Sequence, residues 1–275
     1  MATNAFEEPP LDKWSDTERV LALTVEFVQW AYMVSLCQSS EGTLAESQTA
    51  KATTDENRRL VALAGGIAIV GTIWMIMAIT VAESLTPGYI ISKYQISGLG
   101  SPIFLGTCTT VPDCLAAPST PIQPASAIFV SAVFLSAILG LWYAYLLHKA
   151  AAHRRFALAI VVSMVGWFLV GVSYLPFYLG LSGEGVVVGA FVLHLGGAYT
   201  YGLVGLGAAI STYRFTRAPM KYLSVILAVV SAAAFLLMGS GIYLGLGLGG
   251  MQRMGVYPLF LWTVAFGAYL TRGLD

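Results

Sequence analysis

Six long apolar stretches dominate this sequence, and its charged residues fall between the stretches rather than inside them. A helix needs roughly 20 apolar residues to cross a hydrocarbon core about 30 Å thick. Lipid offers no hydrogen-bond partner to an open backbone, so long uncharged stretches predict transmembrane helices. We therefore predict an all-α, polytopic membrane helix bundle. Its six expected spans are 60–82, 126–148, 156–181, 186–211, 221–246 and 254–271.

The first 57 residues differ from the rest of the chain, because they are rich in acidic side chains. Their one apolar run, 19–36, contains Glu26 and Gln29, which favours an amphipathic surface helix over a seventh span. No apolar run with a cleavage site indicates a secretory signal. The sequence thus predicts a cytoplasmic tail at 1–57, either solvated or docked on a partner, and a transmembrane domain at 58–275.

Composition supports a membrane protein, since 57% of the 275 residues are apolar and 10% are charged. Globular domains carry about a quarter charged residues. A soluble fold of this length would have too little polar surface to cover its core. This excludes a cytosolic enzyme, a nucleic-acid binder and a secreted disulfide scaffold. The partners expected from composition are membrane lipids.

The basic residues predict an orientation. An inside N-terminus places 12 of the 14 Lys and Arg residues on the cytoplasmic side and leaves only Lys93 and Arg253 outside. Cytoplasmic loops carry an excess of Lys and Arg in membrane proteins. We therefore predict a multi-pass protein of the cell membrane with both termini in the cytoplasm.

The longest loop, 83–125, is expected outside as a cap over the bundle. It contains Cys108 and Cys114, six positions apart. An oxidising outer compartment favours a structural disulfide between them. The loop has no further His or Cys that could complete a metal site. We expect a disulfide-pinned extracellular cap loop, no metal and no cofactor.

Polar groups at membrane depth are costly, so each is a candidate for function. His194 lies about 12 Å into its span, at 1.5 Å per residue, and is either a neutral imidazole bonded to a neighbour or a proton carrier or ligand contact. Arg253 either reaches the headgroups, pairs with Glu83 or Glu184, or holds an anionic headgroup. Nearby aromatic residues could instead form an interfacial belt. The candidate ligand-binding residues on the outer side are Glu83, Tyr94, Ser97, Tyr174, His194, Arg253 and Tyr257.

A glycine-rich run near residue 245 contains a formal G-x-G-x-x-G. The run ends a predicted transmembrane helix and follows no strand, so it does not indicate a nucleotide site. We expect Gly241, Gly245 and Gly249, with the glycines of the fourth helix, to allow close packing of helices four and five. The sequence lacks a Ser/His/Asp set, an H-E-x-x-H motif and a P-loop, so no enzymatic activity is predicted.

Several short motifs occur in a recognisable order: Y-Q-I-S-G-L-G at 94–100, Ser126–Phe129, Gly171–Pro176, His194, and a C-terminal group within 250–270. Together they resemble a prokaryotic six-helix membrane family known as domain of unknown function nine-nine-eight. In that family an acid is more usual where Gln252 stands. The family is itself distantly similar to the Frag/DRAM/Sfk type, which is linked to lipid and membrane trafficking. The resemblance covers roughly 60–272 and implies the same architecture, without catalytic residues.

These observations favour a non-enzymatic protein that binds a lipid or small amphiphile in an outward-facing cavity beneath the cap. It could equally serve as a subunit of a membrane complex or a homo-oligomer. The alternative is a small-molecule or proton-coupled transporter that uses His194.

Overall fold

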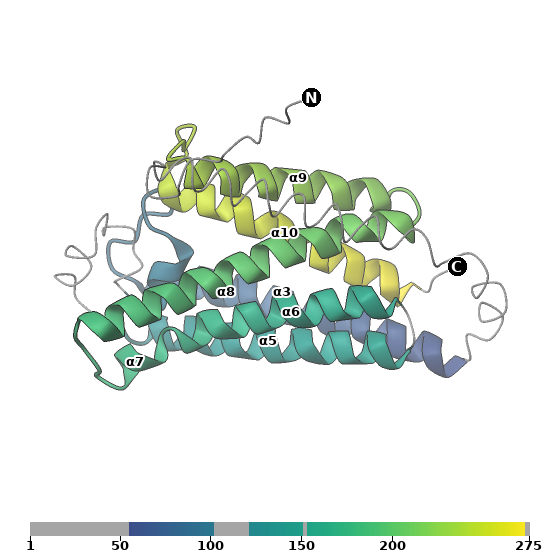
Figure 1. Cartoon of the computed structure of the whole chain (residues 1–275), viewed down its shortest axis with the longest axis horizontal. Coiled ribbons are helices and arrows are strands. Elements are labelled where there is room, and N and C mark those ends of the chain that lie inside the picture. The colour runs from purple at the N-terminus through teal and green to yellow at the C-terminus, as the bar shows by residue number, and fades with distance from the viewer. Residues whose placement is uncertain (1–54, 102–120, 151–152, 273–275) are drawn as a thin grey trace, which may run out of the picture. The chain divides into compact units, whose positions relative to one another are not determined.

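The computed structural model describes residues 55–101, 121–150 and 153–272, and these residues form an all-α bundle (Figure 1). Six of its helical segments are long and apolar enough to cross a membrane. The elements are α3 (Asp55–Leu85), the 3₁₀ turn η2 (Ile96–Leu99), α5 (Ala125–Lys149), α6 (Arg154–Val172), α7 (Leu175–Tyr178), α8 (Glu184–Ser211), the 3₁₀ turn η4 (Thr212–Arg214), α9 (Met220–Gly239) and α10 (Gly247–Thr271).

Besides α10, which begins at Gly247 rather than at 254, two boundaries differ clearly from the predicted spans. The third span breaks after Val172, and the short helix α7 carries Pro176 in its first turn, where a missing N–H costs little. The fifth ends at Gly239, because Gly241 and Gly245 take φ values of 72° and 78°, which suit glycine in a turn. The glycine-rich run therefore forms a loop and the start of α10 rather than the end of a transmembrane helix.

Glycines bring two pairs of helices into backbone contact. A Cβ on Gly197 of α8 would lie 2.6 Å from the carbonyl oxygen of Gly166 on α6. A Cβ on Gly65 of α3 would lie 2.4 Å from the carbonyl oxygen of Gly267 on α10. The expectation that glycines serve mainly to join helices four and five was wrong: the close contact of α8 is with α6. Small residues permit this approach, which favours van der Waals packing in lipid.

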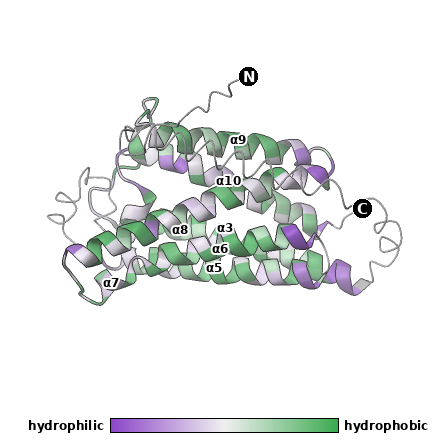
Figure 2. Cartoon of the chain, viewed as in Figure 1, coloured by the Kyte–Doolittle hydropathy of each residue, from purple (hydrophilic) through white to green (hydrophobic). Residues whose placement is uncertain are grey.

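The two ends of the bundle differ in charge. The segment 86–101, called here the cap segment, lies at the end where α3 finishes and α10 begins. We call this the cap end. Every described Lys and Arg other than Lys93 and Arg253 lies at or beyond the opposite helix ends, the basic end, where Figure 2 shows hydrophilic residues gathered.

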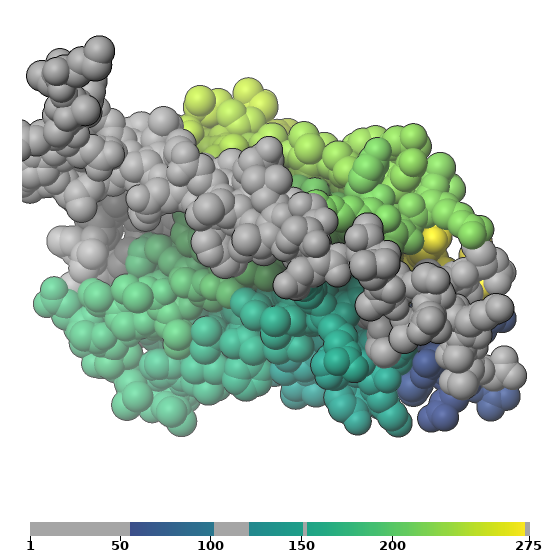
Figure 3. Space-filling model, turned by 45° about the vertical axis from the view of Figure 1, so that its right-hand side comes forward, coloured from purple at the N-terminus to yellow at the C-terminus, as the bar shows by residue number. Residues whose placement is uncertain are grey.

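Large apolar side chains cover the outside of the bundle. Figure 3 shows side chains of α5, α6 and α8 forming one continuous surface, and these helices carry exposed residues such as Leu158 and Val192. An apolar surface of this extent suits lipid rather than water. The predicted amphipathic helix of the tail and the predicted Cys108–Cys114 disulfide lie outside the described residues, and both stay predictions.

Candidate functional site

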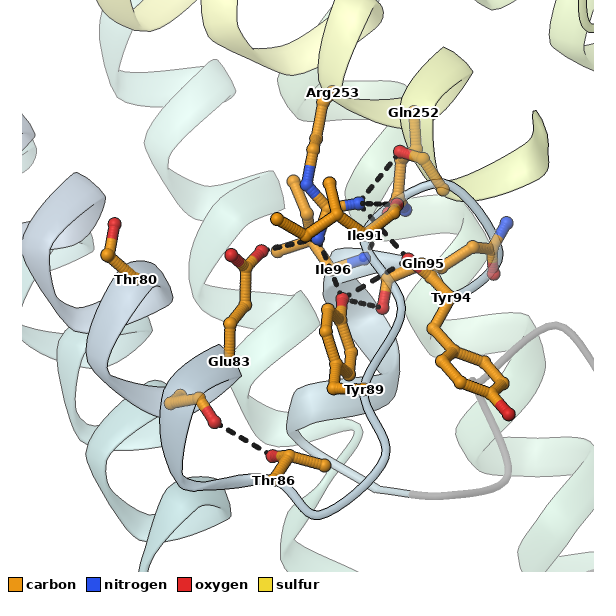
Figure 4. Close-up of polar contacts among 12 residues, drawn as sticks. Thr80, Glu83, Thr86, Tyr89, Ile91, Tyr94, Gln95, Ile96, Gln252 and Arg253 are labelled. Carbon is orange, nitrogen blue, oxygen red and sulfur yellow. Dashed lines mark hydrogen bonds and ion pairs between the residues drawn. The ribbon is translucent and has the colours of Figure 1, made fainter. Parts of the chain in front are cut away.

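Arg253 lies in the second turn of α10, and its side chain is directed toward the cap segment (Figure 4). The residue is only 7% exposed. Its Nη2 donates to the Glu83 carboxylate at the end of α3 and to the Tyr89 hydroxyl at 2.8 Å. Of the alternatives open for Arg253, the structure thus shows an ion pair with Glu83.

Tyr89 connects this ion pair to the cap segment. Its hydroxyl donates to the Gln95 carbonyl at 2.9 Å and accepts from Arg253. Burial raises the pKa of Tyr89 to about 12, although the neighbouring Arg253 opposes that rise. The phenol therefore stays protonated over the physiological range and remains a hydrogen-bond donor.

The second guanidinium nitrogen of Arg253 binds backbone. Nη1 donates to the carbonyls of Ile91 at 2.8 Å, Tyr94 at 3.1 Å and Gly249 at 2.9 Å. Tyr94 offers Arg253 only its carbonyl, because its ring points away from Arg253 (Figure 4); the ring lies 5.7 Å from that of Tyr89 and under the Lys93 ammonium. The ion pair and the carbonyl contacts together hold the cap segment against α3 and α10.

The cap segment lies directly on the start of α10 because that start is glycine. A Cβ on Gly247 would lie 2.2 Å from the Ser92 carbonyl oxygen, and one on Gly249 would lie 2.2 Å from that of Tyr94. The Gly249 N–H donates to the Ser92 carbonyl at 3.0 Å. Any side chain at these two positions would push the cap segment away.

Gln252 makes a further contact with the cap segment. Its Oε1 accepts from the Ile96 N–H at 2.6 Å, and its Nε2 donates to Ser97 Oγ at 3.5 Å. The amide thus contacts both a backbone N–H and a hydroxyl of the cap segment. Ser97 also accepts, through its carbonyl, the hydroxyl of fully buried Tyr174 at 3.2 Å.

His194 lies on α8 beside this chain of contacts. Its Nδ1 is 3.2 Å from Ser173 Oγ, and its ring meets Tyr174 edge-on at 5.5 Å. Because the Ser173 hydroxyl donates to the Val170 carbonyl, Nδ1 must be the donor to Ser173. The structure therefore places His194 as a buried imidazole bonded to a neighbour.

The structure brings most of the predicted site residues together at the cap end. Glu83, Arg253 and the Tyr94 carbonyl form one group, and Ser97, Tyr174 and His194 form the next. Tyr257 follows one turn along α10, close enough to Glu83 and Arg253 to interact electrostatically, with its ring stacked at 6.0 Å on Phe260. Tyr89 and Gln252 belong to these groups but are not among the site residues predicted from the sequence. Two sequence signals could have identified them: Tyr89 lies six residues after Glu83, and Gln252 is adjacent to Arg253.

A cavity of about 60 Å³ lies deeper, between α3, α5, α6, α8 and α10. Met75, one of its lining residues, is ten residues before the end of α3, or about 15 Å from it at 1.5 Å per residue. A site needs about 10–15 Å³ for each water, so the cavity holds about four. Most lining residues are apolar; the polar ones are Thr72, Ser136, Tyr143, Ser163, Trp167, Tyr201 and Thr263.

The polar groups around this central cavity are unequally satisfied. Trp167 Nε1 donates to Ser136 Oγ at 2.9 Å, and Ser163 Oγ donates to the Tyr201 carbonyl at 3.0 Å. Tyr143 and Tyr201 are 3% and 7% exposed, yet neither hydroxyl bonds to any side chain or backbone group of the described residues. No side chain that lines the cavity is ionisable at neutral pH.

No family model matches the chain, and no curated protein or solved structure matches it. The family resemblance therefore rests on its short motifs. Within 55–101, 121–150 and 153–272, no three His, Cys, Asp or Glu side chains lie close enough to hold a metal ion. The six candidate spans define a multi-pass membrane protein.

Proposed function

We propose that this multi-pass membrane protein binds a lipid or small amphiphile between its helices and catalyses no reaction. The central cavity carries the proposal: five helices surround it, its walls are mostly apolar, and a few polar groups converge on it. Apolar walls with a few convergent polar groups are typical of ligand sites in helix bundles, and at about 60 Å³ this cavity has room for part of such a ligand. The proposed site is the middle of the bundle rather than the space beneath the cap, because both terminal guanidinium nitrogens of Arg253 donate to protein groups and its Nε, which lacks a partner among the described residues, is fully buried.

The proposal includes an orientation. The gathering of described Lys and Arg residues at the basic end supports a cytoplasmic location for that end. The cap end would then face outward, both termini would be cytoplasmic, and residues 83–125 would form an outer cap loop with a Cys108–Cys114 disulfide. Membership of the six-helix family is part of the same proposal, supported by the shared number of spans and by the motifs.

Transport by way of His194 has less support. The imidazole bonds to Ser173 and is absent from the residues that line the central cavity. Proton-coupled flux into liposomes that disappears in His194→Phe would favour transport. A role as a complex subunit or homo-oligomer is separated from ligand binding by the next experiment.

Native mass spectrometry of the full chain in mild detergent tests ligand binding. Gly205 lines the cavity, and a Cβ there would lie 3.3 Å from Ser163 Oγ, so Gly205→Leu should fill it. Gly207→Leu is the matched control, because nothing lies within 4 Å of a Cβ at that position. We expect one chain with bound amphiphile, lost in Gly205→Leu and kept in Gly207→Leu. A ligand-free wild-type chain, or one found only in ligand-free assemblies, would refute the proposal.

A further inference from the structure

The central cavity contains two hydroxyl groups that the described protein leaves without a partner. Tyr143 enters from α5 and Tyr201 from α8, and both line the cavity. Neither oxygen is among the fully buried polar atoms that lack a partner, and a hydrogen bond made to such a hydroxyl contributes about 0.5–1.5 kcal/mol. Two such groups at one cavity favour an occupant that accepts or donates hydrogen bonds.

The other hydroxyls at the cavity present acceptors. Each proton goes to a backbone carbonyl: that of Thr72 to Ala68, that of Ser136 to Val133, that of Ser163 to Tyr201 and that of Thr263 to Leu259. Their remaining lone pairs are acceptors, and the two tyrosines supply donors. The cavity can therefore satisfy a group that both gives and receives hydrogen bonds.

Charge restricts the ligand further. The residues that line the cavity include no Asp, Glu, Lys, Arg or His. An ionised group in such surroundings would lose its hydration without gaining a counter-charge, which is far more costly than burying a neutral polar group. We infer that the central cavity binds the uncharged, oxygen-bearing head of an amphiphile, a hydroxyl or a carbonyl, through Tyr143 and Tyr201. This inference rests on the proposed function and names the ligand class.

The size of the cavity agrees with a head group. A volume of about 60 Å³ accepts a hydroxyl with its first carbons and excludes a whole acyl chain. Gly140 of α5 and Met164 of α6 also line the cavity, and both are only partly buried. The flexible Met164 side chain lies against Gly140, and its mobility suits a place where the apolar tail passes to the lipid.

Three amphiphiles with one chain and different heads test this inference. The full chain in nanodiscs is labelled with a photoreactive oleyl alcohol, and unlabelled oleyl alcohol, oleate and oleylamine compete at pH 9, where the last two are charged. Oleyl alcohol should compete at least tenfold better than either charged compound. Tyr143→Phe and Tyr201→Phe should each weaken its binding about 3–10-fold, the value of one hydrogen bond.

Two neighbouring tyrosines provide matched controls. Tyr145 and Tyr199 are each two residues from a cavity tyrosine and are 58% exposed, so their Phe variants should bind as wild type does. Circular dichroism confirms that each variant is folded. Saturable binding with no preference for the alcohol, or Tyr143→Phe and Tyr201→Phe variants that bind like the controls, would overturn this inference alone. Saturable binding of none of the three compounds would overturn the proposed function with it.

Discussion

Replacement of Arg253 by leucine should release the cap segment from the helix bundle. In the wild type, Arg253 neutralises Glu83, bonds to Tyr89 and satisfies the carbonyls of Ile91 and Tyr94. Leucine keeps much of the apolar volume and removes all of these bonds. Breaking a buried ion pair from one side costs about 3–5 kcal/mol, because the remaining charge stays buried without a partner.

The substitution should mainly lower the free energy of local opening of the cap segment. Hydrogen–deuterium exchange of the peptide that covers residues 86–101 measures that opening directly. A loss of about 3 kcal/mol corresponds to exchange more than 100-fold faster. Peptides from the middle of α5 and α6 should keep wild-type rates, because no contact of Arg253 reaches them.

Lys93→Leu is the control for the loss of a positive charge at the cap end. The Lys93 ammonium lies 5.3 Å above the Tyr94 ring and is exposed, so its removal should leave exchange within about twofold of wild type. Glu83→Gln should have a smaller effect than Arg253→Leu, since the guanidinium keeps its carbonyl partners. Exchange in Arg253→Leu as slow as in Lys93→Leu would refute the assignment of Arg253 as the residue that fastens the cap segment.

Three other variants test the packing, the pH dependence and the cavity. Gly197→Ala should lower the free energy of unfolding by about 1–3 kcal/mol, whereas the adjacent Gly196→Ala, with open space, should not; denaturant titrations of both decide. Since the Tyr89 pKa rises from 10 to about 12, the Tyr89 contribution to stability should fall between pH 10 and 12 by up to about 1.4 kcal/mol per unit, and thermal melts of Tyr89→Phe should show a pH dependence smaller than that of the wild type by this amount. Tyr143→Phe should leave Tm unchanged or higher without ligand; a clear decrease would show that the hydroxyl has a protein partner.

The pattern of apolar and charged residues predicted the helices well because a single physical requirement determines that pattern. A span must satisfy its own backbone and exclude charge, and six candidate spans are found. The distribution of the basic residues drew attention to Arg253, which with Lys93 was predicted on the outer side, and the structure buries Arg253 in α10. Its pairing with Glu83 was among the expected alternatives, because both residues were predicted at the same end of the bundle.

The cap contacts and the cavity could not be predicted in the same way. Gly249 was expected to contact a helix, and it contacts the Tyr94 carbonyl instead. A glycine allows close approach of either a helix or a loop, and which of the two lies there depends on the path of the chain. Tyr143 and Tyr201 lie within apolar stretches, where a tyrosine can face lipid, a neighbouring helix or a cavity. Only the packing of the five helices around the cavity distinguishes these three outcomes.

The two polar regions of the bundle therefore differ in what they can bind. At the cap end, both terminal guanidinium nitrogens of Arg253 donate hydrogen bonds to Glu83, Tyr89 and backbone carbonyls. A ligand there would have to displace contacts that hold the cap segment. In the central cavity, the Tyr143 and Tyr201 hydroxyls bond to no described residue, so a ligand would gain bonds without breaking any within the described protein. Binding is accordingly favoured in the cavity, and the charged cluster that stands out in the sequence serves to fix the structure around it.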